Sequence, residues 1–133
     1  METREVVTAF LSLGGKVLIL RRSDRVGTYG GKWAGISGYL EPGDPSPLER
    51  ARTEVREEAG VENARLLKEG KPFEVIDEGL GRRWIVHPFL FEVDEGRVRL
   101  DWESVEARWI EPDRLREFDH VPGLDLSLKA VLS

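Results

Sequence analysis

Four consecutive aliphatic residues, Val17-Leu18-Ile19-Leu20, constrain the fold of this chain more than any other stretch of its sequence. A strand with one face in water alternates apolar and polar residues, whereas a strand covered on both faces reads as a continuous apolar run. A second apolar stretch, Val6 to Leu11, precedes the run, and Gly14-Gly15 separates the two. We therefore predict a hairpin of strands 6–11 and 16–20, in a sheet that helices cover on both faces.

The clearest helix signal covers residues 47–59. Ser46 is a suitable N-cap, Pro47 fits the first helical position, and Glu49 completes a Ser-x-x-Glu capping box. Gly60 is a natural left-handed terminator. The sequence therefore predicts one well-capped helix. A long segment rich in Gly, Pro and Asp precedes it, and such loops commonly carry function.

The rest of the chain alternates short apolar segments with turn signals and shows neither a repeat nor a linker. Further strands are predicted at residues 33–39, 64–68, 73–77, 84–93 and 107–111. Two short helices are predicted from Pro112 and near Leu124. Pro88 indicates an edge position or a bulge in the longest strand, and Trp102 and Trp109 are assigned to the core. We expect a single domain over residues 1–133, with an α/β (α+β) layered fold around a mixed sheet.

The composition argues against several classes of protein. A net charge of −5, from 20 Lys and Arg against 25 Asp and Glu, does not suit a surface that wraps long nucleic acid. Without a run of about 20 apolar residues or a signal sequence, a soluble cytoplasmic protein with no membrane segment is expected. Because the chain has no cysteine, a bound metal needs oxygen or histidine ligands, which favours magnesium, calcium or manganese. High charge, a single asparagine and no glutamine fit a heat-adapted source.

Glu54, Glu57 and Glu58 carry the strongest chemical signal. Their spacing of i, i+3 and i+4 places three carboxylates on one face of the predicted helix. A separate apolar stripe would hold the helix against the sheet and consists of Leu48, Ala51, Val55 and Ala59. The alternative is a solvated helix face, with Arg50 paired to Glu54 at i+4. Repulsion between the like charges of Glu54 and Glu58 favours a divalent cation instead.

Residues 38–61 resemble the Nudix box, whose pattern is Gly-x5-Glu-x7-Arg-Glu-U-x-Glu-Glu-x-Gly-U with U aliphatic. Asp44 stands in place of the usual glutamate, one extra residue precedes the helix core, and Thr53 occupies the usual arginine position. These departures put in question the salt bridge that normally steadies the metal-binding glutamates. The likeness extends over nearly the whole chain. Before the box, Leu20-Arg21-Arg22 and Gly31-Lys32-Trp33 resemble segments of family members, and after it Glu103, six residues before Trp109, is placed like an additional metal-binding or catalytic glutamate in some of them.

This resemblance implies a Nudix-like α/β/α sandwich with a mixed β-sheet and a site for Mg2+, with Mn2+ as the alternative ion. The implied metal ligands are Glu54, Glu57 and Glu58, joined by the carbonyl of Gly38. The implied general base is Glu54 or Glu57, with Glu103 as the alternative, and the sequence leaves this choice open.

Five further residues are candidates for substrate binding. Guanidinium groups bind phosphate oxygens through paired hydrogen bonds, and indoles stack on bases. The candidates are Arg21, Arg22, Trp33, Arg83 and Trp84. Solvation of the arginines and packing of the tryptophans are the alternative interpretations.

The activity implied by the resemblance is metal-dependent cleavage of the pyrophosphate linkage in a small nucleotide-like substrate. The expected substrate is a nucleoside diphosphate linked to another moiety, of the nucleotide sugar or ADP-ribose class. The alternatives are a nucleoside triphosphate pyrophosphatase that removes damaged nucleotides and a noncatalytic nucleotide-binding sensor. An isomerase-like relative also stays open, because Gly35-Ile36-Ser37-Gly38 stands where Pro-Gly-Gly is common. Related enzymes are often homodimers, so the resemblance also suggests a homodimer.

Overall fold

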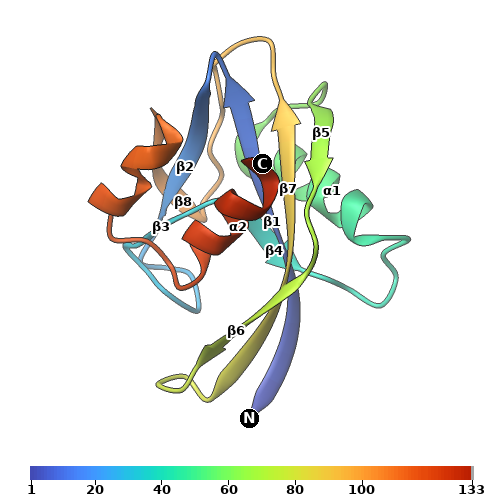
Figure 1. The fold of residues 1–133 in the computed structure, drawn as a ribbon, viewed down its shortest axis with the longest axis vertical. Coiled ribbons are helices and arrows are strands. Elements are labelled where there is room, and N and C mark those ends of the chain that lie inside the picture. The colour runs from blue at the N-terminus through green and yellow to red at the C-terminus, as the bar shows by residue number, and fades with distance from the viewer. Residues whose placement is uncertain (133) are drawn as a thin grey trace.

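A mixed sheet of eight strands forms the middle layer of the molecule (Figure 1). The computed structural model describes residues 1–132. The strands are β1 (Glu2–Leu13), β2 (Lys16–Arg22), β3 (Trp33–Ala34), β4 (Ile36–Tyr39), β5 (Arg65–Glu69), β6 (Phe73–Asp77), β7 (Arg82–Glu92) and β8 (Ser104–Ile110). The helices are α1 (Pro47–Ala59), the 3-10 helix η1 (Pro112–Glu117) and α2 (Leu124–Leu132). Within residues 1–132, no helix has the length and apolar character needed to cross a membrane.

Strands β1 and β7 lie at the centre of the sheet and pair in parallel along most of their length. Strands β1 and β2 form the predicted hairpin, but they pair only at its closed end, Ser12 with Val17 and Leu13 with Lys16. Farther from the turn, β4 pairs with β1, whereas β3 and β8 pair with β2. The two halves of the sheet therefore separate toward the open end of the hairpin.

Side chains that alternate along the central strands build two cores, one on each face of the sheet. Leu11 of β1 belongs to a core that includes Ala51 and Val55 of α1. Its neighbour Phe10 points to the other face and belongs to a core with Leu128 of α2. Figure 1 shows α2 in front of the sheet and α1 on the opposite side. The predicted α/β/α sandwich with a mixed sheet is confirmed.

Helix α1 has the predicted bounds because its signals are local. The Ser46 hydroxyl accepts a hydrogen bond from the backbone N–H of Glu49 at 3.1 Å. Gly60 adopts the left-handed conformation at φ 69° and its N–H closes the last turn. The apolar stripe lies in the core, with Ala51, Val55 and Ala59 buried. This packing fixes the direction in which the glutamate face of α1 points.

Of the two alternatives for Pro88, the edge position is wrong, because β7 is a central strand that pairs with β1 on one side and with β5 and β6 on the other. The ladder is nevertheless irregular on the side of β5 and β6. Pairing with β6 ends at Val86 and pairing with β5 begins at Phe89, so the ladder is interrupted between them. The carbonyl of Pro88 accepts a hydrogen bond from Gly70 across this interruption at 2.9 Å. The proline lacks an N–H donor and occupies the place where the ladder does not need one.

The expectation for Trp102 is also wrong, because 56% of its surface is exposed. It lies in the turn just before β8, outside the strand ladder. Trp109 is partly buried against the α1 core as predicted, and its indole N–H donates to the Gly96 carbonyl at 3.0 Å.

Candidate metal and substrate site

Three carboxylates meet at the open end of the sheet. Glu54 and Glu58 come from α1, and Glu103 comes from the turn before β8. One ligand atom from each lies within 4.8 Å of the others. Two oxygens bound to one divalent ion at about 2.1–2.5 Å are at most about 5 Å apart, so this spacing suits a shared cation. We refer to these three residues as the acidic cluster.

The acidic cluster is unfavourable without a bound cation or proton. Burial, with the neighbouring Glu54, raises the pKa of Glu58 well above its usual value. Burial, with the nearby charges of Asp101 and Glu54, raises the pKa of Glu103 to about 7. Among the atoms of residues 1–132, Glu58 Oε2 is buried and finds no hydrogen-bond partner. Because a buried carboxylate oxygen without a partner is costly, this set of oxygen donors fits a hard divalent ion such as Mg2+ or Mn2+.

Arg50 supplies a salt bridge to the acidic cluster from an unexpected position. Its Nε and Nη2 donate to the two carboxylate oxygens of Asp44 at 2.9 and 2.8 Å, and its Nη1 donates to Glu54 at 3.0 Å. The three side chains are at most 19% exposed, and the guanidinium lowers the pKa of Asp44. Arg50 precedes Thr53 by three residues and therefore lies on the same side of α1. The Arg50–Glu54 pair thus belongs to the cluster and does not mark a solvated face.

Gly38 of β4 lies against the carboxyl group of Glu54. A Cβ at position 38 would overlap that carboxyl group, so glycine is needed here for space. The backbone of Gly38 therefore runs beside the acidic cluster, where its carbonyl is a candidate ligand.

A cavity of about 430 Å3 opens beside the acidic cluster. Glu54, Glu57 and Glu103 are among the residues that line it. Glu57 is exposed and lies on the cavity wall, outside the group of three carboxylates that meet. The structure therefore places Glu103 beside Glu54 and Glu58 of α1, whereas Glu57, also on α1, lies on the solvent side of these three carboxylates.

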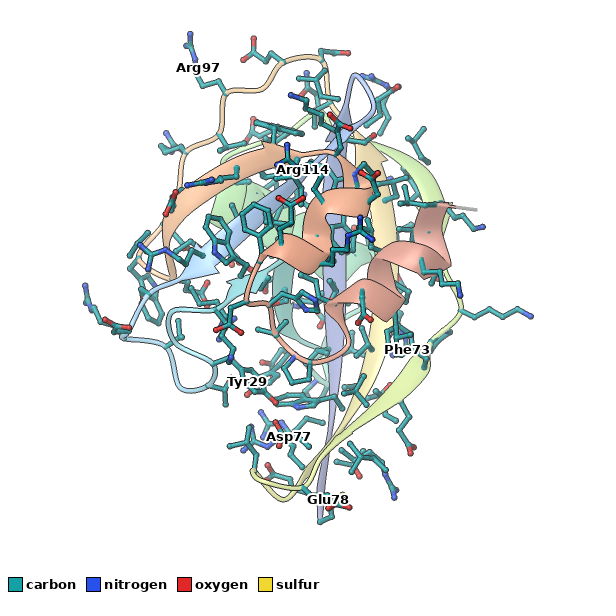
Figure 2. The ribbon with its side chains drawn as sticks, turned by 60° about the vertical axis from the view of Figure 1, so that its left-hand side comes forward. Tyr29, Phe73, Asp77, Glu78, Arg97 and Arg114 are labelled. Carbon is teal, nitrogen blue, oxygen red and sulfur yellow. The ribbon has the colours of Figure 1, made fainter. Side chains whose placement is uncertain are left out.

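One side of the cavity is an aromatic wall formed by Tyr29, Tyr39 and Trp84. Tyr39 and Trp84 stack with ring centroids 6.2 Å apart and planes 14° apart. The indole N–H of Trp84 donates to the Tyr29 hydroxyl at 3.1 Å, and this hydroxyl donates to Asp77 at 2.6 Å. Tyr29 and Asp77 lie close together near the lower end of the molecule in Figure 2. Burial and the Asp77 carboxylate raise the pKa of Tyr29 to about 12, so the hydroxyl keeps its proton and the wall stays fixed.

Of the five predicted substrate-binding residues, Arg22 and Trp84 line the cavity. The other three lie elsewhere. Arg21 pairs with a carboxylate of β8 at 3.2 Å, and Arg83 faces a carboxylate of β6 at 3.5 Å. Trp33 is buried in the α2 core, where its ring packs edge-on against an aromatic side chain.

Three aromatic residues that line the cavity are not among the sequence-based candidates: Tyr29, Tyr39 and Trp102. Tyr39 follows Gly38 directly and Trp102 precedes Glu103 directly, so adjacency to a predicted site residue was the available signal. Tyr29 has no such signal, because it reaches the cavity from a loop whose path the sequence does not define.

Comparison with known proteins gives one family. A family model described as NUDIX domain matches residues 2–130. Nucleoside triphosphatase NudI of Escherichia coli (strain UMN026) is 27% identical over 129 residues, which cover 90% of this chain and 89% of that protein. A MutT NUDIX hydrolase from Burkholderia pseudomallei superposes with a TM-score of 0.74 at 24% identity, covering 98% of this chain and 99% of that chain. The NUDIX domain of Shewanella oneidensis NrtR, solved with ADP ribose, superposes with a TM-score of 0.78 at 12% identity, covering 98% and 86%.

Proposed function

The chain belongs to the Nudix hydrolase family, and we propose that it binds magnesium at the acidic cluster and hydrolyses a nucleoside diphosphate linked to another moiety. One observation carries this proposal: three carboxylates converge within 4.8 Å beside a cavity with an aromatic wall. The buried, unpartnered Oε2 of Glu58 supports a cation at this point. Manganese is the alternative ion, because it accepts the same oxygen donors.

The residues around the cavity suggest how the chain acts on such a substrate. A divalent ion held by Glu54, Glu58 and Glu103 would neutralise phosphate charge and lower the pKa of water. Glu54, Glu57 and Glu103 all line the cavity and are the candidates to accept the proton of the attacking water. Water adds to one phosphorus, the bridging P–O bond breaks, and two phosphate monoesters leave.

The aromatic wall and the charge of the cavity support the substrate class. Tyr39 is 38% exposed and offers aromatic surface to a nucleobase, with Trp84 stacked against it, and bases bind such rings by stacking. Arg22 and Arg50 are the basic residues that line the cavity, and Arg50 is occupied by Asp44 and Glu54. A diphosphate leaves less negative charge to balance than a triphosphate does, which favours the diphosphate.

A nucleoside triphosphate is the second candidate substrate. It is favoured by the similarity to NudI, which is named as a nucleoside triphosphatase. Noncatalytic binding of a nucleotide is a third outcome that the same experiment detects, as tight binding without turnover.

The test is a panel of nucleotide sugars, ADP-ribose and nucleoside triphosphates, each with Mg2+ or Mn2+, read by release of phosphate monoester or pyrophosphate. We expect Glu57→Gln and Glu58→Gln each to lower kcat/KM at least about a hundredfold, the scale for removing a group from metal or acid–base catalysis. The matched control is Glu62→Gln, because Glu62 is exposed just beyond α1 and does not line the cavity. Near-normal turnover in both Glu57→Gln and Glu58→Gln, with folding unchanged, would contradict the proposed site.

A further inference from the structure

Trp102 stands out among the tryptophans because its indole is 56% exposed, whereas those of Trp33 and Trp84 are 8% exposed. Exposure of so large an apolar ring forgoes the burial that usually stabilises tryptophan. Trp102 nevertheless lines the same cavity as the acidic cluster. Within residues 1–132, the one cation found over this ring is the guanidinium of Arg25, 5.9 Å from its centroid, and no aromatic ring stacks on it.

The backbone that carries Trp102 is held in place. The N–H of Glu103 donates to the Asp101 carboxylate at 2.9 Å, and the carbonyl of Glu103 accepts the N–H of Ser23 at 2.8 Å. The indole is therefore presented from a fixed turn directly before one member of the acidic cluster.

Trp102 and the aromatic wall approach the acidic cluster from different halves of the sheet. Trp102 precedes β8, which pairs with β2, whereas Tyr39 and Trp84 lie on β4 and β7, which pair with β1. Tyr39 follows Gly38, which contacts Glu54, and Trp102 precedes Glu103. Because Glu54 and Glu103 meet in the cluster, each aromatic surface adjoins the carboxylates through a different member, and all of these residues line one cavity.

From this placement we infer that Trp102 determines specificity by binding the second ring-bearing moiety of the substrate. This inference rests on the proposed function, because it places the phosphoanhydride at the acidic cluster. A substrate cleaved there then has one ring on the aromatic wall and a second ring, a sugar or a base, on Trp102. A nucleoside triphosphate has a ring at one end only, so its terminal phosphate leaves Trp102 without a stacking partner.

The experiment compares two ligands that cannot be hydrolysed, the α,β-methylene analogues of ADP-ribose and of ATP, by calorimetry on the full chain with Mg2+. For Trp102→Ala we expect the Kd of the ADP-ribose analogue to rise about tenfold, within the range for loss of one stacking contact. The Kd of the ATP analogue should change less than about twofold. Trp102→Phe keeps an aromatic ring and should restore most of the affinity for the ADP-ribose analogue.

Leu67→Ala is the matched control, because Leu67 on β5 is 52% exposed and does not line the cavity. It should leave both affinities unchanged. The inference is overturned if Trp102→Ala weakens both analogues equally, if it weakens neither, or if the wild-type chain binds only the ATP analogue. To distinguish a sugar from a base as the second ring, the α,β-methylene analogue of diadenosine diphosphate is titrated in the same way. Absence of turnover across the substrate panel, with the binding pattern intact, would contradict the proposed hydrolysis but not the role of Trp102.

Discussion

At the scale of single residues, Arg50 decides how the acidic cluster is held together. It binds both oxygens of Asp44 and one oxygen of Glu54, and a planar guanidinium can do this in one orientation. Asp44 also accepts the backbone N–H of Glu41 at 2.7 Å, so Arg50 joins the loop before α1 to the cluster. Arg50 thereby takes the place of the arginine that the Nudix box usually has at the position of Thr53.

Arg50→Ala should therefore destabilise the chain and weaken the metal site together. Two poorly exposed carboxylates, Asp44 and Glu54, lose their shared partner, and we expect a cost of about 2 kcal/mol in the free energy of unfolding. Arg50→Lys should recover little, because an ammonium group cannot reproduce three directed hydrogen bonds. Urea unfolding and Mg2+ titration measure the two effects. Arg56→Ala, an exposed change on the same helix, should cost less than about 0.5 kcal/mol, and equal stability of the two alanine variants would refute the role.

Sequence reasoning located the acidic residues better than the aromatic ones, for a physical reason. The positions of Glu54 and Glu58 follow from helix periodicity, which is a local property. Trp102 and Trp109 have the same apolar side chain, and their burial depends on where the β8 ladder with β2 begins. Arg21 and Arg22 are likewise neighbours on β2, yet strand alternation sends only Arg22 to the cavity.

At the scale of elements, the start of α2 is coupled to β6. Gly123, just before α2, has φ +83°, and a Cβ there would lie 2.5 Å from Cγ2 of Val75. Gly123 and Leu124 both line the cavity, so this contact also positions part of the site. The existence of α2 and β6 follows from local patterns in the sequence. Their contact does not, since it depends on the path of the chain between them.

Gly123→Ala should be much more damaging than an alanine at another left-handed glycine. Gly81 has φ +63°, and a Cβ there would meet no atom of residues 1–132 within 4 Å, so Gly81→Ala carries the conformational cost alone, about 1–2 kcal/mol. Gly123→Ala adds the overlap with Val75 and should cost about 1–3 kcal/mol more. Thermal unfolding compares the two variants, and KM for the best substrate should rise only for Gly123→Ala. Equal melting temperatures would show that α2 and β6 can separate without cost.

At the scale of the whole molecule, the titrating carboxyl groups fall into two classes. The pKa values of Asp44, Asp77, Glu106 and Glu117 are lowered by hydrogen bonds to Arg50, Tyr29, Arg108 and Arg114 respectively. Their contribution to stability is complete above the usual carboxyl range and is lost only as the pH falls below it. Burial instead raises the pKa values of Glu58 and Glu103. Of these two classes, only the second changes its contribution to stability between mildly acidic and neutral pH.

The metal-free chain should consequently lose stability as the pH rises from about 5 to about 8. The folded state holds protons on Glu58 and Glu103 that the unfolded state has already released, so its advantage shrinks as the pH rises through an interval that includes the Glu103 pKa of about 7. Calorimetry in EDTA should show the melting temperature falling by roughly 5 °C across this range, and by less in Glu103→Gln, which has one fewer titrating group. Saturating Mg2+ favours the deprotonated carboxylates and should remove or reverse the decline. A melting temperature that rises with pH in EDTA would mean that the pKa values of Glu58 and Glu103 are not raised in the folded chain.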